Sequence, residues 1–175
     1  PSTPVEGLCA RATADAGLVV PANYNCPGQI AVSGEVAGVE RAMAMAKDAG
    51  AKPIRLHVSG AFHSPLMEDA VPGLEEAITR ADLTDPHFPI YANVTAQPVD
   101  NAILARQLLL QQLTAPVQWT HEFEALARRY PDALFVEMGP GSVLTGLLTR
   151  IVPSAAGMAC GTPAEIEKLL TRIAA

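Results

Sequence analysis

The sequence predicts an α/β fold, and three observations support that prediction. Short β-rich runs alternate with helical runs along the 175 residues, as they do when helices cover a sheet. Helical runs end at glycines, as the run at 36–49 does at Gly50. Hydrophobic residues make up 49% of the chain and charged residues 17%, which is enough apolar material for one ordinary core or two small lobes.

The first 58 residues follow the order helix, strand, strand, helix, strand. This is the order of a ferredoxin-like unit that lacks its first strand. A sheet with one position empty would expose an unpaired edge, so we expect the missing strand upstream of Pro1. We therefore expect residues 1–58 to form a truncated ferredoxin-like small subdomain. The expected helices are 5–14 and 36–49, the expected strands are 18–20, 29–33 and 52–58, and a polar loop is expected at 23–28.

From residue 59 onward the pattern is that of a larger α/β unit. Ser64 can cap a helix that runs to about Arg80, and Pro72 should kink or divide that helix. Strands that alternate with helices are typical of a largely parallel sheet. We expect residues 59–175 to belong to one large subdomain. The further expected strands are 89–94, 133–138 and 158–160, and the further expected helices are 101–113, 120–130, 142–151 and 163–173.

Composition and charge exclude several classes of protein. The formal net charge of -6 argues against a nucleic-acid-binding surface, which needs a basic stripe. No apolar run reaches the roughly 20 residues of a membrane helix. The cysteines Cys9, Cys26 and Cys160 are odd in number and form no C-x-x-C pair, so neither a zinc site nor a disulfide framework is indicated. We expect a cytoplasmic protein without a metal or a cofactor.

One histidine of the four stands at a junction that suits chemistry. His57 falls in an expected strand, His87 in a loop and His121 near a helix start, and each fits an ordinary polar or surface role. His63 follows a strand and precedes a helix, and open α/β sheets place functional groups at such junctions. Histidine ordinarily titrates near neutral pH, so His63 is a candidate general base. A role as an ordinary residue at a helix start remains open at this point.

Four segments of the sequence form an ordered series. They read N-Y-N-C-P-G-Q at 23–29, V-S-G-A-F-H-S-P-L-M at 58–67, Q-L-T-A-P-V-Q-W at 112–119 and E-M-G-P-G-S-V-L-T-G-L at 137–147. The series resembles the C-terminal motifs of malonyl-CoA:acyl carrier protein transacylases and related polyketide acyltransferase domains. The resemblance implies an α/β-hydrolase-like large subdomain beside the ferredoxin-like small one.

The resemblance also implies a reaction and its residues. The family moves a malonyl group from coenzyme A to the phosphopantetheine thiol of acyl carrier protein through a seryl-acyl enzyme. His63 matches the histidine that deprotonates the serine, and Gln112 matches a residue whose backbone carbonyl orients the ring. Asn25, Gln29 and Phe62 are the implied substrate-binding residues. An aromatic residue directly before the histidine resembles the malonyl-preferring form of polyketide acyltransferases, and malonyl-CoA and acyl carrier protein are the implied partners.

The family's nucleophile is absent from these residues. It belongs to a G-x-S-x-G elbow, and no serine of the chain has glycine two positions before it. The family's malonyl-binding arginine and oxyanion loop are also expected in a missing N-terminal half of the same enzyme. The chain begins without methionine, which fits a fragment, a processed chain or a recombinantly chosen segment. The alternatives are an excised part of a polyketide synthase acyltransferase and a non-catalytic module that binds acyl carrier protein.

Each of the four segments also has an ordinary structural interpretation, and Phe62 in 58–67 could simply be a core residue. Residues 23–29 could be a simple turn, and Trp119 could be an apolar anchor at a helix start. Gly139–Gly141 could cradle an anion through its backbone N–H groups. A tight turn that permits close packing is an equally good interpretation of these glycines.

Overall fold

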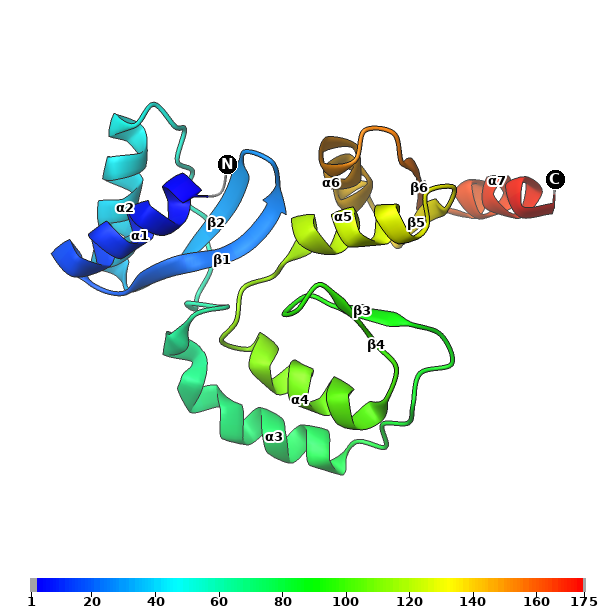
Figure 1. Ribbon diagram of the computed structural model, residues 1–175, viewed down its shortest axis with the longest axis horizontal. Helices are drawn as coiled ribbons and strands as arrows, with labels where there is room; N and C mark the ends of the chain where they lie inside the picture. The colour runs from blue at the N-terminus through cyan, green and yellow to red at the C-terminus, as the bar shows by residue number, and fades with distance from the viewer. Residues whose placement is uncertain (1–2, 175) are drawn as a thin grey trace. The chain divides into compact units, whose positions relative to one another are not determined.

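The computed structural model describes residues 3–174, which have a mixed α/β architecture (Figure 1). The chain divides into two compact units, the first ending at Glu122 and the second beginning at Phe123. The division falls within helix α5 (Trp119–Arg129). Residues 1, 2 and 175, which the predicted subdomains included, lie outside the described residues.

The N-terminal part of the first unit contains a β hairpin that lies against two helices (Figure 1). The strands pair antiparallel, with Cys26 opposite Gln29 at the turn. Gly28 in this turn has φ +78°, which glycine adopts without strain. The predicted order of helix, strand, strand and helix is confirmed. The bounds are α1 (Thr3–Ala16), β1 (Val19–Cys26), β2 (Gln29–Gly34) and α2 (Val36–Asp48).

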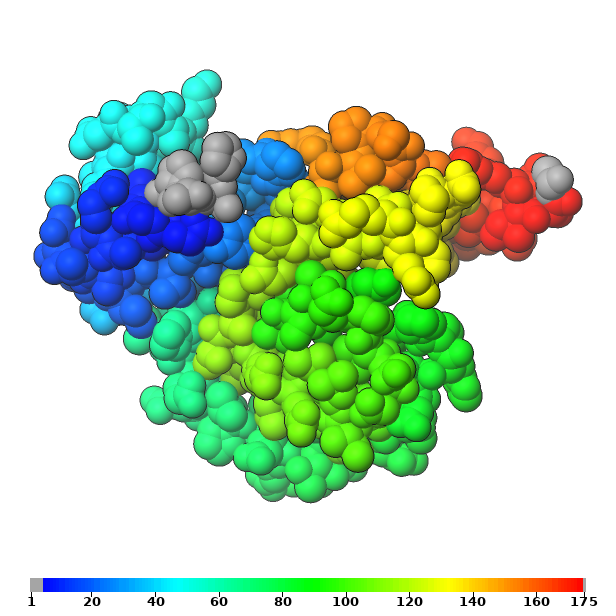
Figure 2. All heavy atoms as spheres, in the orientation of Figure 1, coloured from blue at the N-terminus to red at the C-terminus, as the bar shows by residue number. Residues whose placement is uncertain are grey.

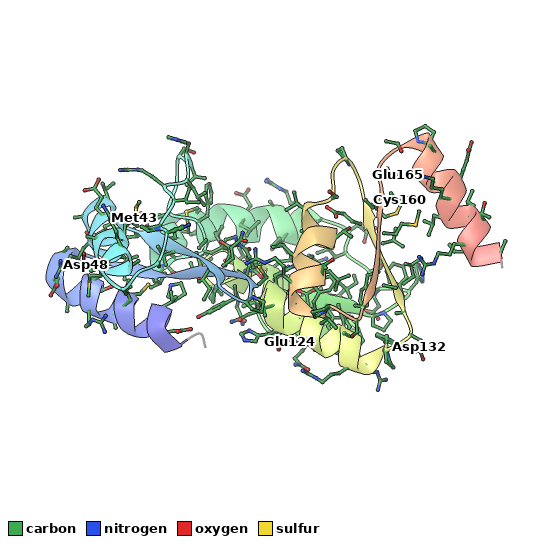
Figure 3. All side chains as sticks on the ribbon, turned by 90° about the horizontal axis from the view of Figure 1, so that it is seen from above. Met43, Asp48, Glu124, Asp132, Cys160 and Glu165 are labelled. Atoms are coloured by element: carbon green, nitrogen blue, oxygen red, sulfur yellow. The ribbon has the colours of Figure 1, made fainter. Side chains whose placement is uncertain are left out.

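Side chains from both helices and from β1 form the core of this hairpin layer. The spacing that predicted α2 places Val39 and Ala42 on its inner face, and Ala42 is fully buried there. Met43 and Asp48 of the same helix are marked in Figure 3. Removing these apolar surfaces from water stabilises the layer. The buried members of the cluster are Cys9, Ala12, Val19 and Ala42.

Strand β1 is longer than predicted. The sequence suggested a strand that ends at Val20 and then a polar loop, but the strand continues to Cys26. Register shifts interrupt the pairing with β2 between Pro21 and Asn23 and again beyond Tyr24, so the strand contains two irregularities. The prediction was wrong because cross-strand pairing overrides the local turn preference of asparagine and proline.

The strand predicted at 52–58 is also absent, because no described strand pairs with this segment. Its apolar side chains alternate with polar ones, and Ile54, Leu56 and Val58 are 80%, 60% and 65% exposed. Arg55 forms an exposed ion pair with Glu40 at 3.1 Å. A strand needs a neighbour for its backbone N–H and C=O groups, so the β pattern has no sheet to join within these residues.

Beyond residue 60 the first unit consists of helices and a second hairpin. Pro72 divides the predicted helix into a 3₁₀ helix and an α-helix, as expected. Arg106 of α4 donates hydrogen bonds to the carbonyls of Ile78 and Ala81 at the end of α3, which joins the two helices. Atoms of this part fill the space that the ribbon leaves open (Figure 2). The bounds are η1 (Pro65–Ala70), α3 (Val71–Arg80), β3 (Ile90–Ala92), β4 (Gln97–Val99) and α4 (Ala102–Gln112).

The second unit contains a parallel strand pair joined through a helix. The expectation of a largely parallel sheet holds for this pair only. The other two pairs are antiparallel, because the short connections 27–28 and 93–96 form hairpins. No described helix combines the length and the apolar character needed to cross a bilayer. The bounds are β5 (Leu134–Met138), α6 (Val143–Ile151), β6 (Ala156–Cys160) and α7 (Pro163–Ala174).

Helix α7 begins with a reciprocal cap. The Glu165 carboxylate accepts hydrogen bonds from the backbone N–H groups of Gly161 and Thr162, each at 2.9 Å. The Thr162 hydroxyl accepts from the N–H of Glu165 at 3.3 Å, which completes a capping box. These bonds, that from Gly161 first, hold the pKa of Glu165 below its usual value. Figure 3 marks Glu165 in the first turn of the helix.

Candidate active site

His63 lies in the turn that precedes η1, and its backbone is unusual. Its φ is +57°, in the left-handed region that residues other than glycine seldom adopt. Such a conformation costs a residue with a Cβ about 1–2 kcal/mol, so the surrounding structure must hold it. Strain of this kind is concentrated at functional sites. The backbone at His63 therefore supports the choice of this histidine among the four.

Ser64 caps the 3₁₀ helix that follows the histidine. Its side chain is fully buried, and its hydroxyl donates a hydrogen bond to the carbonyl of Ala61 at 2.6 Å. The same oxygen accepts from the backbone N–H of Leu66 at 3.3 Å. The predicted capping role of Ser64 is confirmed, although the first turns of the helix are 3₁₀ rather than α.

The His63 ring is hydrogen-bonded to a backbone carbonyl. Nδ1 of His63 lies 3.1 Å from the carbonyl oxygen of Gln112, the last residue of α4. A carbonyl oxygen can only accept, so Nδ1 carries the proton. In the neutral ring Nε2 then has the free lone pair. The contact thus fixes one tautomer, the one in which Nε2 can take a proton from another group.

Gln112 is itself held by the loop that follows α4. Its side-chain Nε2 donates to the carbonyls of Ala115 at 3.0 Å and Pro116 at 3.4 Å. The loop is tied to β1, because the N–H of Val117 donates to the Ala22 carbonyl at 2.8 Å and its carbonyl accepts from Tyr24 at 2.9 Å. The carbonyl that orients His63 is therefore anchored through this loop to the first hairpin.

The other predicted site residues lie on separate elements. Asn25 is half-buried in β1, and Gln29 is exposed at the start of β2. The thiol of Cys26 lies 3.8 Å from the Gln29 side-chain oxygen, which is a weak hydrogen bond. Phe62 is 48% exposed, and a Cβ added at Gly60 would lie 3.2 Å from its ring. The structure joins His63 to Gln112 and places Asn25 and Gln29 at the hairpin turn.

Tyr24 ties the first hairpin to neighbouring elements, a role that its sequence motif did not indicate. Its hydroxyl donates to a Glu6 carboxylate oxygen at 2.7 Å, and its carbonyl accepts from the Thr120 hydroxyl at 2.8 Å. Burial, together with the bond to Glu6, raises the pKa of Tyr24 to about 12, so the phenol keeps its proton. The alternation of Ala22, Tyr24 and Cys26 was the available signal, because period-two spacing with an aromatic residue is typical of a strand.

Glu122 is a buried carboxyl group that the sequence motifs did not single out. It is only 6% exposed on α5, and its Oε2 has no hydrogen-bond partner among the described residues. Burial raises the pKa of Glu122 to about 7. The signal was helical spacing: Glu122 lies three residues after Trp119 and four before Leu126, which places it on the apolar face of the helix.

The turn at Gly139–Gly141 favours close packing over anion binding. A Cβ added at Gly161 would lie 2.1 Å from the Gly139 carbonyl oxygen, so the two segments meet backbone to backbone. The N–H groups at the start of α6 are already used, because the Glu137 carboxylate accepts from Thr145 at 2.7 Å and Leu144 at 3.1 Å. These bonds, those from Thr145 first, lower the pKa of Glu137.

A histidine whose ring is fixed by a backbone carbonyl, in a turn that leads into a 3₁₀ helix, suits an acyl-transferring enzyme that uses an activated hydroxyl or thiol. Within residues 3–174, no three histidine, cysteine, aspartate or glutamate side chains are grouped to hold a metal ion. Comparison with known families agrees with that class. The chain belongs to the acyl transferase domain family, whose model matches residues 7–166.

Relatives of this chain are malonyl transacylases. The malonyl CoA-acyl carrier protein transacylase of Bacillus subtilis is 38% identical over 158 residues, which are 90% of this chain and 50% of that protein. The crystal structure of the malonyl-CoA:acyl carrier protein transacylase of Xanthomonas oryzae pv. oryzae is 39% identical, with a TM-score of 0.90, over 97% of this chain and 54% of that one.

A third relative was solved with a partner. It is a malonyl-transacylase in complex with its type II polyketide synthase acyl-carrier protein, and it is 34% identical with a TM-score of 0.89. The match covers 96% of this chain and 54% of that one. The chain thus spans about half the length of the relatives it matches.

Proposed function

We propose that this chain supplies the general base of an S-malonyltransferase that moves malonyl from coenzyme A to acyl carrier protein in fatty acid biosynthesis. The observation that carries the proposal is the 3.1 Å contact between Nδ1 of His63 and the Gln112 carbonyl. It leaves Nε2 as the proton acceptor. The serine nucleophile lies outside these 175 residues, since the sequence contains no G-x-S-x-G elbow.

The reaction needs Nε2 of His63 to take up and release a proton twice. In the first half, Nε2 takes the serine proton as the oxygen attacks the malonyl thioester, and the proton then goes to the departing coenzyme A thiolate. In the second half, Nε2 takes the proton of the phosphopantetheine thiol, whose sulfur attacks the seryl ester. Collapse of that adduct returns the proton to the serine oxygen. No atom or charge is left over, and His63 ends neutral.

A neutral carbonyl partner suits this cycle. A carboxylate beside Nδ1 would stabilise the imidazolium form strongly, because opposite charges favour the charged state. The Gln112 carbonyl fixes the tautomer with a smaller preference for that form. The ring can then return its proton to coenzyme A or to serine in each half-reaction.

The finer assignments follow from the resemblance and remain proposals. Residues 1–58 form a truncated ferredoxin-like subdomain, and 59–175 form part of an α/β-hydrolase-like subdomain. Asn25, Gln29 and Phe62 contact the substrate. The partners are malonyl-CoA, acyl carrier protein and the missing half of the same enzyme, in the cytoplasm and without a metal, a cofactor or nucleic acid. The relative solved with an acyl carrier protein supports that partner.

Labelling with radioactive malonyl-CoA tests the proposal. The 175-residue chain alone should acquire no stable malonyl ester, because it lacks the nucleophile. A hybrid enzyme, in which the unmatched half of the Bacillus subtilis relative is joined ahead of Pro1, should acquire one malonyl group per chain. It should also pass that group to acyl carrier protein. Gel autoradiography and mass spectrometry of the intact protein measure both results.

Two outcomes would contradict the proposal. Stable acylation of a serine in the chain alone would show that the nucleophile is within these residues. A folded hybrid enzyme that binds acyl carrier protein without transferring malonyl would favour the non-catalytic binding module. Circular dichroism and a gel-filtration assay of carrier protein binding separate that outcome from misfolding.

Phe62 should influence the choice of acyl group. Its half-exposed ring directly precedes His63, so it occupies the space where a methyl branch on the malonyl group would sit in the proposed site. Phe62→Ala in the hybrid enzyme should reduce the preference for malonyl over methylmalonyl by about 10–200-fold, the range expected for one methyl-sized steric contact. The ratio of the two kcat/KM values measures this preference. Phe88→Ala, which removes a 72% exposed ring, is the matched control.

An unchanged ratio in Phe62→Ala would remove the specificity role. A loss of kcat/KM for both substrates by the same factor would indicate a general packing role instead. Either result would leave the assignment of His63 as the base unaffected.

A further inference from the structure

The hydrogen bond to Gln112 fixes the His63 ring but not the backbone that carries it. The residue stands at φ +57° with a full side chain, and its neighbours Phe62 and Ser64 are not glycine. Relaxation of this backbone toward the ordinary right-handed or extended regions would swing the Cα–Cβ bond away from its present direction. Something in the turn must therefore oppose that relaxation.

The Ser64 hydroxyl bridges the two sides of the histidine. It donates to the carbonyl of Ala61, two residues before His63, and accepts from the N–H of Leu66, three residues after it. The Ser64 carbonyl also accepts from the N–H of Met67 at 3.1 Å. Ser64 is 0% exposed, so water does not compete for these bonds. The buried Ser64 hydroxyl oxygen thus links residues 61 and 66 on either side of His63.

We propose that Ser64 is a positioning residue that holds His63 in its left-handed backbone conformation and so keeps Nδ1 on the Gln112 carbonyl. The inference rests on the proposed role of His63 as the base. The hydroxyl is required because it donates and accepts at once, whereas alanine does neither. Ser64 touches no reacting atom, and its effect passes through the orientation of the ring.

The tautomer of His63 in the 175-residue chain gives a direct test. In the native sequence, ¹⁵N spectra should show the ring predominantly with its proton on Nδ1. Ser64→Ala should shift it toward a mixture of tautomers, because the bond to the Gln112 carbonyl is lost. Thr162→Ala removes a cap from α7 and should lower the melting temperature without changing the His63 signals. A purely structural role for Ser64 would give the same result as that control.

Kinetics in the hybrid enzyme provide the second readout. Ser64→Ala should lower kcat by about 10–10²-fold with KM changed less than about twofold, because a misplacement near 1 Å has that effect on catalysis. Ser64→Thr and Ser64→Val have almost the same shape and differ in the hydroxyl, so they serve if the alanine variant fails to fold. The threonine variant should keep the native tautomer, and the valine variant should lose it.

Native tautomer and native kcat in Ser64→Ala, or equal behaviour of the threonine and valine variants, would overturn the inference. His63→Ala distinguishes this failure from that of the proposed function. If His63→Ala abolishes transfer while Ser64→Ala does not, then the base assignment stands and the positioning role falls. If His63→Ala retains transfer, then the proposed function itself fails.

Discussion

Replacement of His63 by alanine in the hybrid enzyme should lower malonyl transfer by roughly 10²–10⁴-fold, the usual contribution of a general base. The loss should appear in kcat for both half-reactions, since the proposed mechanism assigns the serine proton and the thiol proton to the same Nε2. Rapid-quench measurement of the malonyl-enzyme isolates the first half-reaction. Release of malonyl to a small thiol measures the second.

The matched control is His87→Ala, which removes an exposed histidine from a loop of the same unit. That variant should keep near-normal transfer. Added imidazole should partly restore His63→Ala, because the deleted ring leaves space for a free base of the same kind. Near-normal activity of His63→Ala, or a loss equal to that in His87→Ala, would withdraw the assignment.

Replacement of Glu122 by glutamine should change the dependence of stability on pH. The folded pKa of Glu122 is raised from 4.5 to about 7, because burial opposes the charged form. The stability linked to the protonated acid is therefore fully present below about pH 4.5 and is lost as the pH rises through 7. At pH 8 the native chain must hold a buried carboxylate or take up a proton.

Glutamine has a similar shape and no charge, so Glu122→Gln should stabilise the chain at pH 8 relative to pH 4.5. The change in the free energy of unfolding between these pH values should differ from that of the native chain by about 3 kcal/mol, at 1.36 kcal/mol per pKa unit. Urea titrations from pH 4 to 8 measure it. Glu124→Gln makes the same charge change two residues along α5 and corrects for net charge. Parallel stability curves for native and Glu122→Gln chains would contradict a raised pKa.

Sequence reasoning located the elements whose signals are local. The spacing of Val39 and Ala42 indicated α2, and Pro72 divides its helix because proline has no backbone N–H to donate to the preceding turn. The turn at His63 was also visible, since a β-rich run, a glycine and a capping serine stand in succession. These features depend on a few neighbouring residues, which a single sequence displays.

Features that depend on distant partners were predicted less well. Strand β1 runs to Cys26 because β2 and Val117 pair with it, and Val117 is far in the sequence from the polar residues that suggested a loop. The 52–58 segment has the residue pattern of a strand and no described partner.

In the candidate site, too, features that depend on residues distant in the sequence were the harder ones to predict. The contact between His63 and Gln112 joins residues that are 49 apart, and only the family resemblance indicated it in the sequence. The burial of Glu122 follows from helix spacing, but its missing hydrogen-bond partner does not. Tertiary contacts determine the His63–Gln112 bond and the missing partner of Glu122.

The alternating segment at 52–58 has a consequence for association between copies of this chain. Exposed Ile54, Leu56 and Val58 would favour pairing with any β-forming segment, which is how aggregation begins. Lys52 and Arg55 oppose self-pairing, because in-register copies would bring like charges together, and Pro53 cannot donate to a ladder. These three residues therefore disfavour stacking of identical chains but leave a neutral or acidic strand free to pair with the segment.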